Sequence, residues 1–254
     1  MINSKAKRER TTVRLRDLTL SSAKDFFKIL AAKLGFESSL ERKVFCVGMQ
    51  RTGTTSFGDF CETQLGLSRR GYSISHKRGW TRAWYNGHLD DVFRDPYFRT
   101  GEVFDDDPWW CPGVASIVLN RFPQAKLVMF RREPEAWFRS LLSHSHGKSP
   151  GYTDIHARIY GREAEFTALL TNGVDIPLTN GFDLEGQREF YMEKLEEHQN
   201  WIASLASKQP DRVLVLKLDD PDKFRKIAVF LEFEDRPYTD VRSNVIASLA
   251  DNNR

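Results

Sequence analysis

With 254 residues, the chain is long enough for one α/β domain with a full hydrophobic core. The hydrophobic share of 40% and the charged share of 29% are those of an ordinary globular protein, and a formal net charge of +3 gives no argument for nucleic acid as a partner. Three cysteines without a CxxC spacing argue against a disulfide framework and a cysteine-rich zinc site. No apolar stretch approaches the roughly 20 residues that cross a bilayer, and the N-terminus has no signal-peptide pattern, so we expect a cytoplasmic protein.

The N-terminus is polar and basic, with six basic side chains against one acid between Lys5 and Arg16. A short amphipathic helix is predicted over 24–34. Its apolar face holds Phe26, Phe27, Leu30 and Leu34. Such a helix either packs on the domain or on a second subunit, or makes weak peripheral contact with anionic lipid together with the basic arm. We therefore expect an N-terminal arm and helix over 1–40 and an α/β domain over 41–254.

From Lys43 onward, short apolar strands alternate with helices. Strands are predicted over 43–48, 101–105, 125–130 and 212–217, and helices over 54–64, 112–121, 134–143, 186–207 and 221–231. Continuous runs of Val, Leu and Phe between helices indicate a parallel sheet that is covered on both faces. The sequence therefore predicts an α/β fold of three layers, with a central parallel β-sheet flanked by helices.

The most informative segment is Gly48-Met-Gln-Arg-Thr-Gly-Thr-Thr-Ser56, between the first strand and its helix. Two glycines at such a turn let main-chain N–H groups surround a phosphate, and the helix N-terminus adds partial positive charge. This indicates a P-loop-like fold. In a loop that binds ATP or GTP, a lysine follows the second glycine, but here Thr54 does, and the cation, Arg51, comes earlier. The alternative is a glycine turn with an incidental arginine.

An arginine inside the loop can lie against the bridging oxygen of a phosphosulfate, where negative charge builds as the S–O bond breaks. Gln50-Arg-Thr-Gly-Thr-Thr-Ser56 resembles the 5′-phosphosulfate-binding loop of the sulfotransferases that use 3′-phosphoadenosine-5′-phosphosulfate (PAPS). The resemblance implies that Arg51 assists departure of the 5′-phosphate. It also implies a set of donor-binding residues in the loop, namely Gln50, Arg51, Thr52, Gly53, Thr54, Thr55 and Ser56.

A second segment, Phe130-Arg-Arg-Glu-Pro-Glu-Ala-Trp-Phe-Arg-Ser140, resembles the RNPxxxxxS pattern by which this family holds the 3′-phosphate. Arg132 and Ser140 fall on the arginine and the serine of that pattern, while Glu133 replaces the usual asparagine. Pro134 can start a helix directly after the strand, and an arginine with a hydroxyl can hold a phosphate by charge-assisted hydrogen bonds. Arg131 is either a second phosphate ligand or a surface residue.

The resemblance covers roughly residues 43–245 and is closest to a branch of small, mostly uncharacterised sulfotransferase-like proteins. In that branch an acidic residue precedes a proline, as in Asp105-Asp-Asp-Pro108. The RKG segment with which cytosolic members also hold the 3′-phosphate is absent, and Arg242 or another basic residue is a candidate substitute.

Sulfuryl transfer to a hydroxyl is helped by a base that takes the proton of the nucleophile. Asp105, Asp106 and Asp107 follow a predicted strand, at the sheet edge where ligands bind in open α/β folds. Adjacent acids repel one another, which raises the pKa of at least one of them. We predict that Asp106 or Asp107 is the base. The alternatives are that these acids cap the next helix or pair with the site arginines, or that His76 is the base, although a single histidine in a basic loop is usually just exposed.

The sequence thus predicts a PAPS-dependent sulfotransferase that acts on a hydroxyl, or an amine, of an unidentified acceptor, either a small molecule or a carbohydrate. No metal is expected, because Arg51, the loop amides and the helix dipole already neutralise the donor. Two other functions stay open. One is a P-loop kinase or NTPase, which Thr54 at the lysine position disfavours. The other is a non-catalytic protein that binds PAP, the 3′,5′-bisphosphate product, which an intact Arg51 disfavours.

Overall fold

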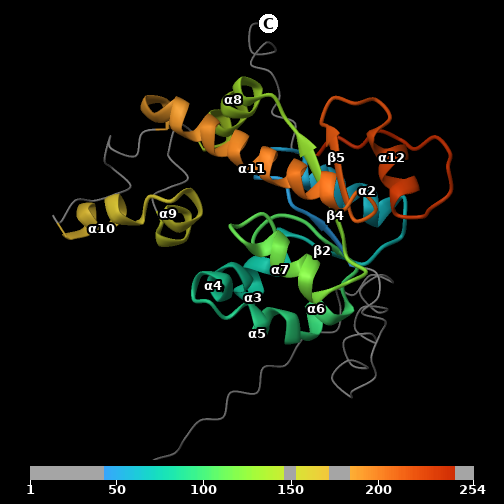
Figure 1. Ribbon diagram of the computed structural model, residues 1–254, viewed down its shortest axis with the longest axis horizontal. Helices are drawn as coiled ribbons and strands as arrows, with labels where there is room; N and C mark the ends of the chain where they lie inside the picture. Colours follow the sequence, from blue (N-terminus) through green and yellow to red (C-terminus); the bar gives the residue numbers. More distant parts are fainter. Residues whose placement is uncertain (1–42, 146–152, 172–183, 244–254) are drawn as a thin grey trace, which may run out of the picture.

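The structure is a computed structural model and describes residues 43–145, 153–171 and 184–243 (Figure 1). In this part of the chain five strands form one sheet, and all neighbouring strands are parallel, in the order β2-β3-β1-β4-β5. The strands are β1 (Val44–Cys46), β2 (Arg69–Arg70), β3 (Val103–Phe104), β4 (Lys126–Arg131) and β5 (Val213–Lys217). The predicted α/β fold with a central parallel sheet is therefore confirmed. The predicted arm and helix over 1–40 lie outside the described residues.

Helices cover the sheet and fill most of the connections between strands. The helices are α2 (Thr54–Thr63), α3 (Tyr72–Arg78), α4 (Trp80–Tyr85), α5 (Leu89–Arg94), α6 (Pro96–Thr100), α7 (Val114–Arg121), α8 (Pro134–Ser145), α9 (Asp154–Tyr160), α10 (Glu163–Thr171), α11 (Arg188–Lys208) and α12 (Lys223–Phe230), with a 3-10 turn, η4 (Glu185–Gln187), before α11. The five predicted helices correspond to α2, α7, α8, α11 and α12. None of these described helices is both long and apolar enough to cross a membrane.

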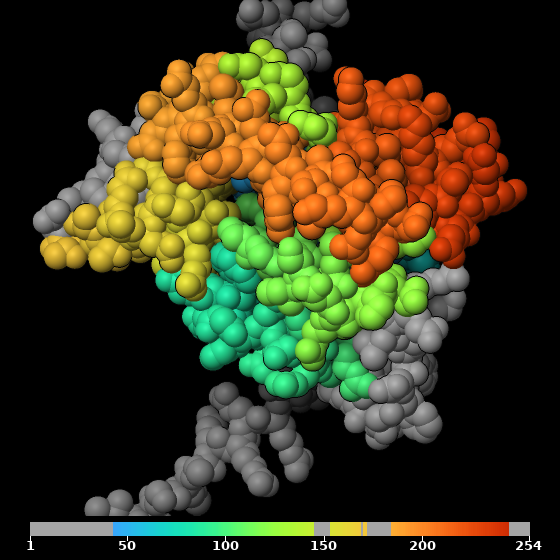
Figure 2. All heavy atoms as spheres, viewed as in Figure 1, coloured from blue at the N-terminus to red at the C-terminus, as the bar shows by residue number. Residues whose placement is uncertain are grey.

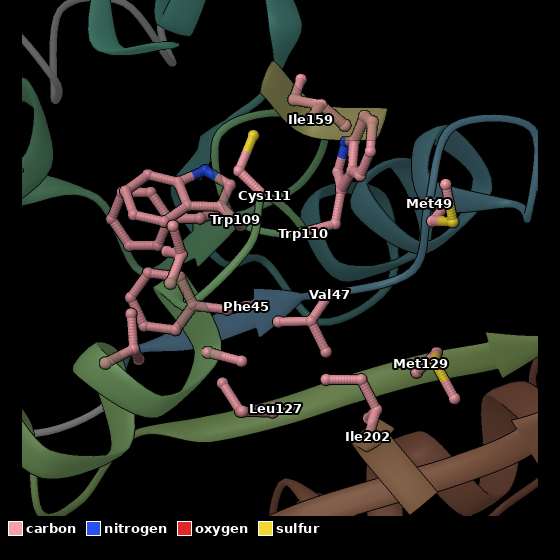
Figure 3. Close-up of a cluster of buried hydrophobic side chains, with 14 of the residues drawn as sticks. Phe45, Val47, Met49, Trp109, Trp110, Cys111, Leu127, Met129, Ile159 and Ile202 are labelled. Carbon is pink, nitrogen blue, oxygen red and sulfur yellow. The ribbon is translucent and has the colours of Figure 1, made fainter. Parts of the chain in front are cut away.

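Side chains alternate between the two faces of the sheet, as the strand period of two requires. On β4, Leu127 and Met129 join one buried cluster, whereas Val128 and Phe130 join another. The first face packs against α7, α8 and α11, and Figure 3 shows Leu127 and Met129 facing Ile202 of α11. The second face packs against α2 and α12. These two cores make the molecule a three-layer α/β domain.

The first cluster extends beyond the sheet into the helices α3–α6. Trp80 and Trp109 are fully buried there, and their rings meet edge to face with centroids 5.8 Å apart. Figure 2 shows this part of the molecule in teal and green, below α11 in orange and α9 in yellow. These helices fill the long connection from β2 to β3, so the domain has an elaborated side next to the carboxyl end of β3.

Candidate active site

The connection from β1 to α2, here termed the phosphate loop (residues 48–56), has the strained backbone of a tight turn. Arg51 has a φ of 65° and Gly53 a φ of 95°. A Cβ at Gly53 would lie 2.6 Å from Leu218 Cδ1, and a Cβ at Gly48 would lie 2.4 Å from Thr52 Oγ1. Thr52 in turn donates its hydroxyl proton to the Met49 carbonyl at 2.7 Å, which holds the turn. A close contact therefore favours glycine at 48, and the positive φ favours it at 53.

The phosphate loop leads directly into the N-terminus of α2. Gly53 is the N-cap residue of this helix and has no side chain that could accept from the first-turn N–H groups. The first turn also holds no acidic residue. The partial positive charge of the helix terminus is thus not offset by a carboxylate of its own first turn, which suits an anionic ligand.

The predicted ligands of the 5′- and 3′-phosphates lie against each other. Arg51 Nε donates to Ser140 Oγ at 3.1 Å, and Arg132 Nη1 donates to the main-chain oxygen of Arg51 at 2.5 Å. Burial lowers the pKa of both arginines, and the charges of Arg51 and Arg139 lower that of Arg132 further. The effect of these charges on Arg132 means that the three cations are close enough for Arg132 to be repelled by the other two. An anion placed between these cations would reduce their repulsion.

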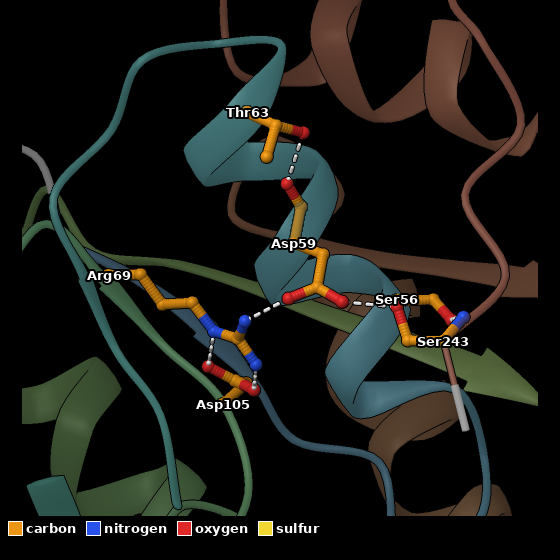
Figure 4. A network of polar contacts seen from close by, with 6 residues as sticks. All are labelled: Ser56, Asp59, Thr63, Arg69, Asp105 and Ser243. Carbon is orange, nitrogen blue, oxygen red and sulfur yellow. Dashed lines mark hydrogen bonds and ion pairs between the residues drawn. The ribbon is translucent and has the colours of Figure 1, made fainter. Parts of the chain in front are cut away.

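On the other side of β1 is the acidic loop, residues 105–108, which follows β3. Asp105 is buried and forms a bidentate ion pair with Arg69, at 2.8 Å from Nε to Oδ1 and 2.6 Å from Nη2 to Oδ2 (Figure 4). Asp107 accepts a 2.7 Å hydrogen bond from Thr81. Asp106 has a φ of 74° and accepts from the N–H of Asp107 at 2.9 Å. The acids therefore neither cap the next helix, whose N-cap is Gly113, nor form an ion pair with Arg51 or Arg132.

The three carboxyl groups differ in their electrostatic surroundings. Burial and the neighbouring Asp107 carboxylate raise the pKa of Asp106 to about 7. Burial also raises the pKa of Asp105, while the Arg69 guanidinium opposes that shift. A carboxyl group that titrates near neutral pH is suited to take a proton from a hydroxyl and return it to solvent. The raised pKa of Asp106 gives it that property.

The comparisons with known proteins bear directly on this geometry. The family model of the sulfotransferase domain matches residues 43–240. The chain belongs to the sulfotransferase family. None of the curated proteins matches it. The matched span contains the phosphate loop, the acidic loop and the strand end with Arg132.

Two consecutive residues of α11, His198 and Gln199, contact the backbone of the site of this sulfotransferase. Burial lowers the pKa of His198, whose Nε2 lies 2.6 Å from the carbonyl oxygen of Val47 at the entry to the phosphate loop. Gln199 is buried, accepts from the N–H of Arg132 at 3.0 Å and donates to its carbonyl at 3.1 Å. The helical pattern predicted α11, but it gave no signal that Gln199 is turned inward, because a lone glutamine on a helix is usually exposed.

Gln50 is held from two directions that the sequence did not predict. Trp137 Nε1 donates to the main-chain oxygen of Gln50 at 2.8 Å. The side-chain amide of Gln50 donates to Tyr160 Oη at 2.9 Å. Tyr160 ends α9, a helix that sequence reasoning missed. An Arg82–Asp154 ion pair fastens the start of α9 to α4. The phosphate loop is thereby connected to the helices that surround the acidic loop.

The remaining candidates lie at the surface. Arg131 is exposed and donates to Asn200 at 3.3 Å, so of its two alternatives the structure supports the surface residue. His76 is exposed on α3. Arg242 is exposed and pairs with Asp240 at 2.8 Å. Glu133, which departs from the family pattern, caps α8 by accepting from the N–H groups of residues 135 and 136 at 3.1 and 2.8 Å.

Proposed function

We propose that this sulfotransferase takes its sulfuryl group from PAPS and transfers it to a hydroxyl, or an amine, of a small molecule or a carbohydrate. The observation that carries the proposal is the direct contact between the phosphate loop and the 3′-phosphate segment. Arg51 bonds to Ser140, and Arg132 bonds to Arg51. A nucleotide with phosphates at both the 3′ and the 5′ positions offers one anion to each of these two segments, whereas a nucleoside triphosphate carries all its phosphates at the 5′ position.

The sheet order supports a division of labour around the phosphate loop. Because β1 lies between β3 and β4, the acidic loop and the strand end with Arg132 flank the phosphate loop at the carboxyl edge of the sheet. In this proposal Arg132 and Ser140 hold the 3′-phosphate, and the loop amides with Thr54, Thr55 and Ser56 hold the 5′ end. The acceptor approaches from the side of the acidic loop.

The proposed reaction needs one bond formed and one bond broken. The acceptor oxygen forms a bond to sulfur while the bond between sulfur and the bridging oxygen breaks, and PAP leaves with the electron pair. Arg51 stabilises the charge that builds on the leaving oxygen, and Asp106 accepts the acceptor's proton. The pKa of Asp106, about 7, lets it be ionised before the reaction and release the proton afterwards.

Ligand-dependent unfolding tests the donor assignment. PAP should raise the melting temperature of the protein, whereas Mg-ATP at the same concentration should not, since only the bisphosphate reaches both anion-binding segments. Incubation with labelled PAPS and a panel of hydroxyl-bearing acceptors then tests turnover. A preference for Mg-ATP would favour a kinase or NTPase, and tight PAP binding with no turnover on any acceptor would favour a non-catalytic PAP-binding protein.

A further inference from the structure

A network of ion pairs and hydrogen bonds connects the acidic loop to the phosphate loop on the far side of β3 (Figure 4). Arg69, in the edge strand β2, grips Asp105 with two nitrogens, and its third nitrogen contacts Asp59 of α2. Asp59 also accepts from the hydroxyl of Ser243, whose N–H donates to Ser56 Oγ at 3.0 Å. One guanidinium thus contacts both the acidic loop and α2, the helix that follows the phosphate loop.

Two glycines leave the space in which this guanidinium lies. A Cβ at Gly58, in the middle of α2, would be 2.3 Å from Arg69 Nε and 2.7 Å from Asp105 Oδ1. A Cβ at Gly71 would be 3.0 Å from the same carboxylate oxygen. Glycine in a helix interior costs about 1 kcal/mol relative to alanine. The helix therefore gives up stability at the one turn where the ion pair needs room.

Stability alone does not account for such an ion pair. The side chain of Asp105 is 1% exposed and that of Arg69 is 16% exposed, so both groups have lost most of their hydration. The attraction between two buried ions roughly offsets that loss, and a hydrophobic pair of similar size often stabilises a fold at least as well. What a bidentate pair supplies that a hydrophobic contact lacks is a fixed direction for the carboxylate and for the backbone that carries it.

The backbone that follows Asp105 is the one that needs to be held. Asp106 has a φ of 74°, a conformation that costs non-glycine residues on the order of 1–3 kcal/mol, although aspartate tolerates it better than most. Its own carboxylate accepts from the N–H of Asp107, and contacts from the surroundings add to this local bond. On the far side, Asp107 is held through its carboxylate by Thr81 and through its carbonyl by Ser75, at 2.7 and 2.6 Å. Asp106 therefore lies between two anchors, of which Arg69 provides the first.

We propose that Arg69 is a positioning residue for the base: its grip on Asp105 holds the acidic loop in the strained conformation that turns Asp106 toward the acceptor. The proposal rests on the function proposed above for its catalytic part, since it takes Asp106 as the base. Its structural part, that Arg69 imposes the conformation of the acidic loop, stands on the contacts alone.

Two substitutions displace the guanidinium in different ways. Arg69→Lys keeps the positive charge but cannot bind Asp105 with two nitrogens. Gly58→Ala keeps the arginine at residue 69 but displaces its guanidinium from Asp105. The same change raises the helix propensity of α2, so the helix itself should not be weakened. Glu62→Ala, on the exposed side of the same helix, is the matched control. Each protein is measured for PAP affinity by calorimetry, for amide hydrogen exchange of residues 105–107, and for the pH profile of turnover with PAPS.

For Arg69→Lys and Gly58→Ala we expect amide exchange at residues 105–107 to accelerate by at least about tenfold. The reason is that the acidic loop can then open without first breaking the bidentate ion pair. We expect kcat to fall by about 100-fold, as for a base displaced by about 1 Å, with the acid limb of the pH profile shifted and PAP affinity within about threefold of wild type. Glu62→Ala should change none of these.

Wild-type exchange and an unshifted pH profile in both variants would overturn the proposal. A fall in PAP affinity as large as the fall in kcat would also overturn it, since Arg69 would then serve the fold of the whole site. If the wild-type protein transfers no sulfuryl group at all, the proposed function fails, yet hydrogen exchange still decides whether Arg69 imposes the conformation of the acidic loop.

Discussion

Arg132 Nη1 lies 2.5 Å from the main-chain oxygen of Arg51, so the end of β4 is bonded directly to the phosphate loop. The bond uses the backbone of Arg51 and leaves its side chain on the side of Ser140. The two arginines therefore differ in what they are placed to do. In the proposed reaction, Arg51 lies inside the loop, where charge would develop during transfer, whereas Arg132 lies at the strand end, where it would contribute to holding the nucleotide.

Removal of the Arg51 side chain should act on turnover more than on binding. In Arg51→Ala we expect kcat with PAPS to fall by about 100- to 1000-fold, because the arginine acts on charge that exists only as the S–O bond breaks. The Kd for PAP should change by less than about tenfold. Arg51→Lys, which restores a cation, should recover part of the rate. Near-normal turnover in Arg51→Ala would contradict the role assigned to this residue.

Arg132→Ala should show the opposite pattern. Loss of a charge-assisted contact to phosphate is expected to raise KM for PAPS by about 10- to 100-fold, with a smaller effect on kcat at saturation. Arg131→Ala is the natural control, since the neighbouring arginine is exposed and contacts Asn200 instead. Equal effects of the two substitutions on KM would show that the contribution is general charge rather than a specific contact.

The sequence predicted the parts of this molecule in which local signals agree. The strands β1, β4 and β5 are continuous apolar runs, and the phosphate loop lies between a strand and a helix, so both could be placed without knowledge of the tertiary structure. The edge strand β2 was missed because it consists of Arg69 and Arg70, which carry no apolar signal. The helices α3–α6 and α9 were missed because they are five to seven residues long and are held by packing rather than by periodicity.

The interactions that organise the site depend on strand order, which the sequence does not specify. One alternative interpretation of the sequence is that the acids at 105–107 pair with Arg51 or Arg132 or cap the next helix. The partner of Asp105 is Arg69, because β2 lies next to β3 in the sheet. Gln199 is similar, since its contact with Arg132 follows from the way α11 crosses the end of β4. Contacts between residues far apart in the chain need the assembled sheet before they can be named.

The pKa of Asp106 gives a test that combines activity with stability. If this residue is the base, kcat/KM should be about tenfold lower at pH 6 than at pH 8, because the carboxyl is mostly protonated below about 7. Asp106→Asn should remove most of the activity and flatten the profile. A profile that is flat between pH 6 and pH 8 in the wild type would place the base elsewhere.

The same raised pKa has a cost in stability. The folded protein binds the proton of Asp106 more tightly than the unfolded chain does, so the penalty grows as the pH rises from about 3.8 to about 7 and is full above that. Asp106→Asn should therefore raise the free energy of unfolding at pH 8 by roughly 1–2 kcal/mol, a discounted value because the group is partly hydrated. Urea unfolding at pH 8 and near pH 4 measures the difference, with the exposed Glu62→Gln as control. Equal stabilisation by Asp106→Asn at both pH values would show that it does not come from the raised pKa of Asp106.

Glu133 replaces the asparagine of the family pattern, and its position predicts that the exchange is structurally neutral. Its carboxylate accepts from two first-turn N–H groups of α8, which lowers its pKa, and asparagine is an equally good N-cap residue. Glu133→Asn should therefore keep the melting temperature and KM for PAPS near wild type. Glu133→Ala, which has no acceptor, should lower the melting temperature by roughly 2–4 °C at pH 7.

The lowered pKa of Glu133 makes this loss depend on pH. The difference in melting temperature between the wild-type and Glu133→Ala proteins should shrink as the carboxyl is protonated in acid. The Glu133→Asn protein should stay more stable than Glu133→Ala throughout. A lower KM in Glu133→Asn at an unchanged melting temperature would instead show that residue 133 contacts the nucleotide.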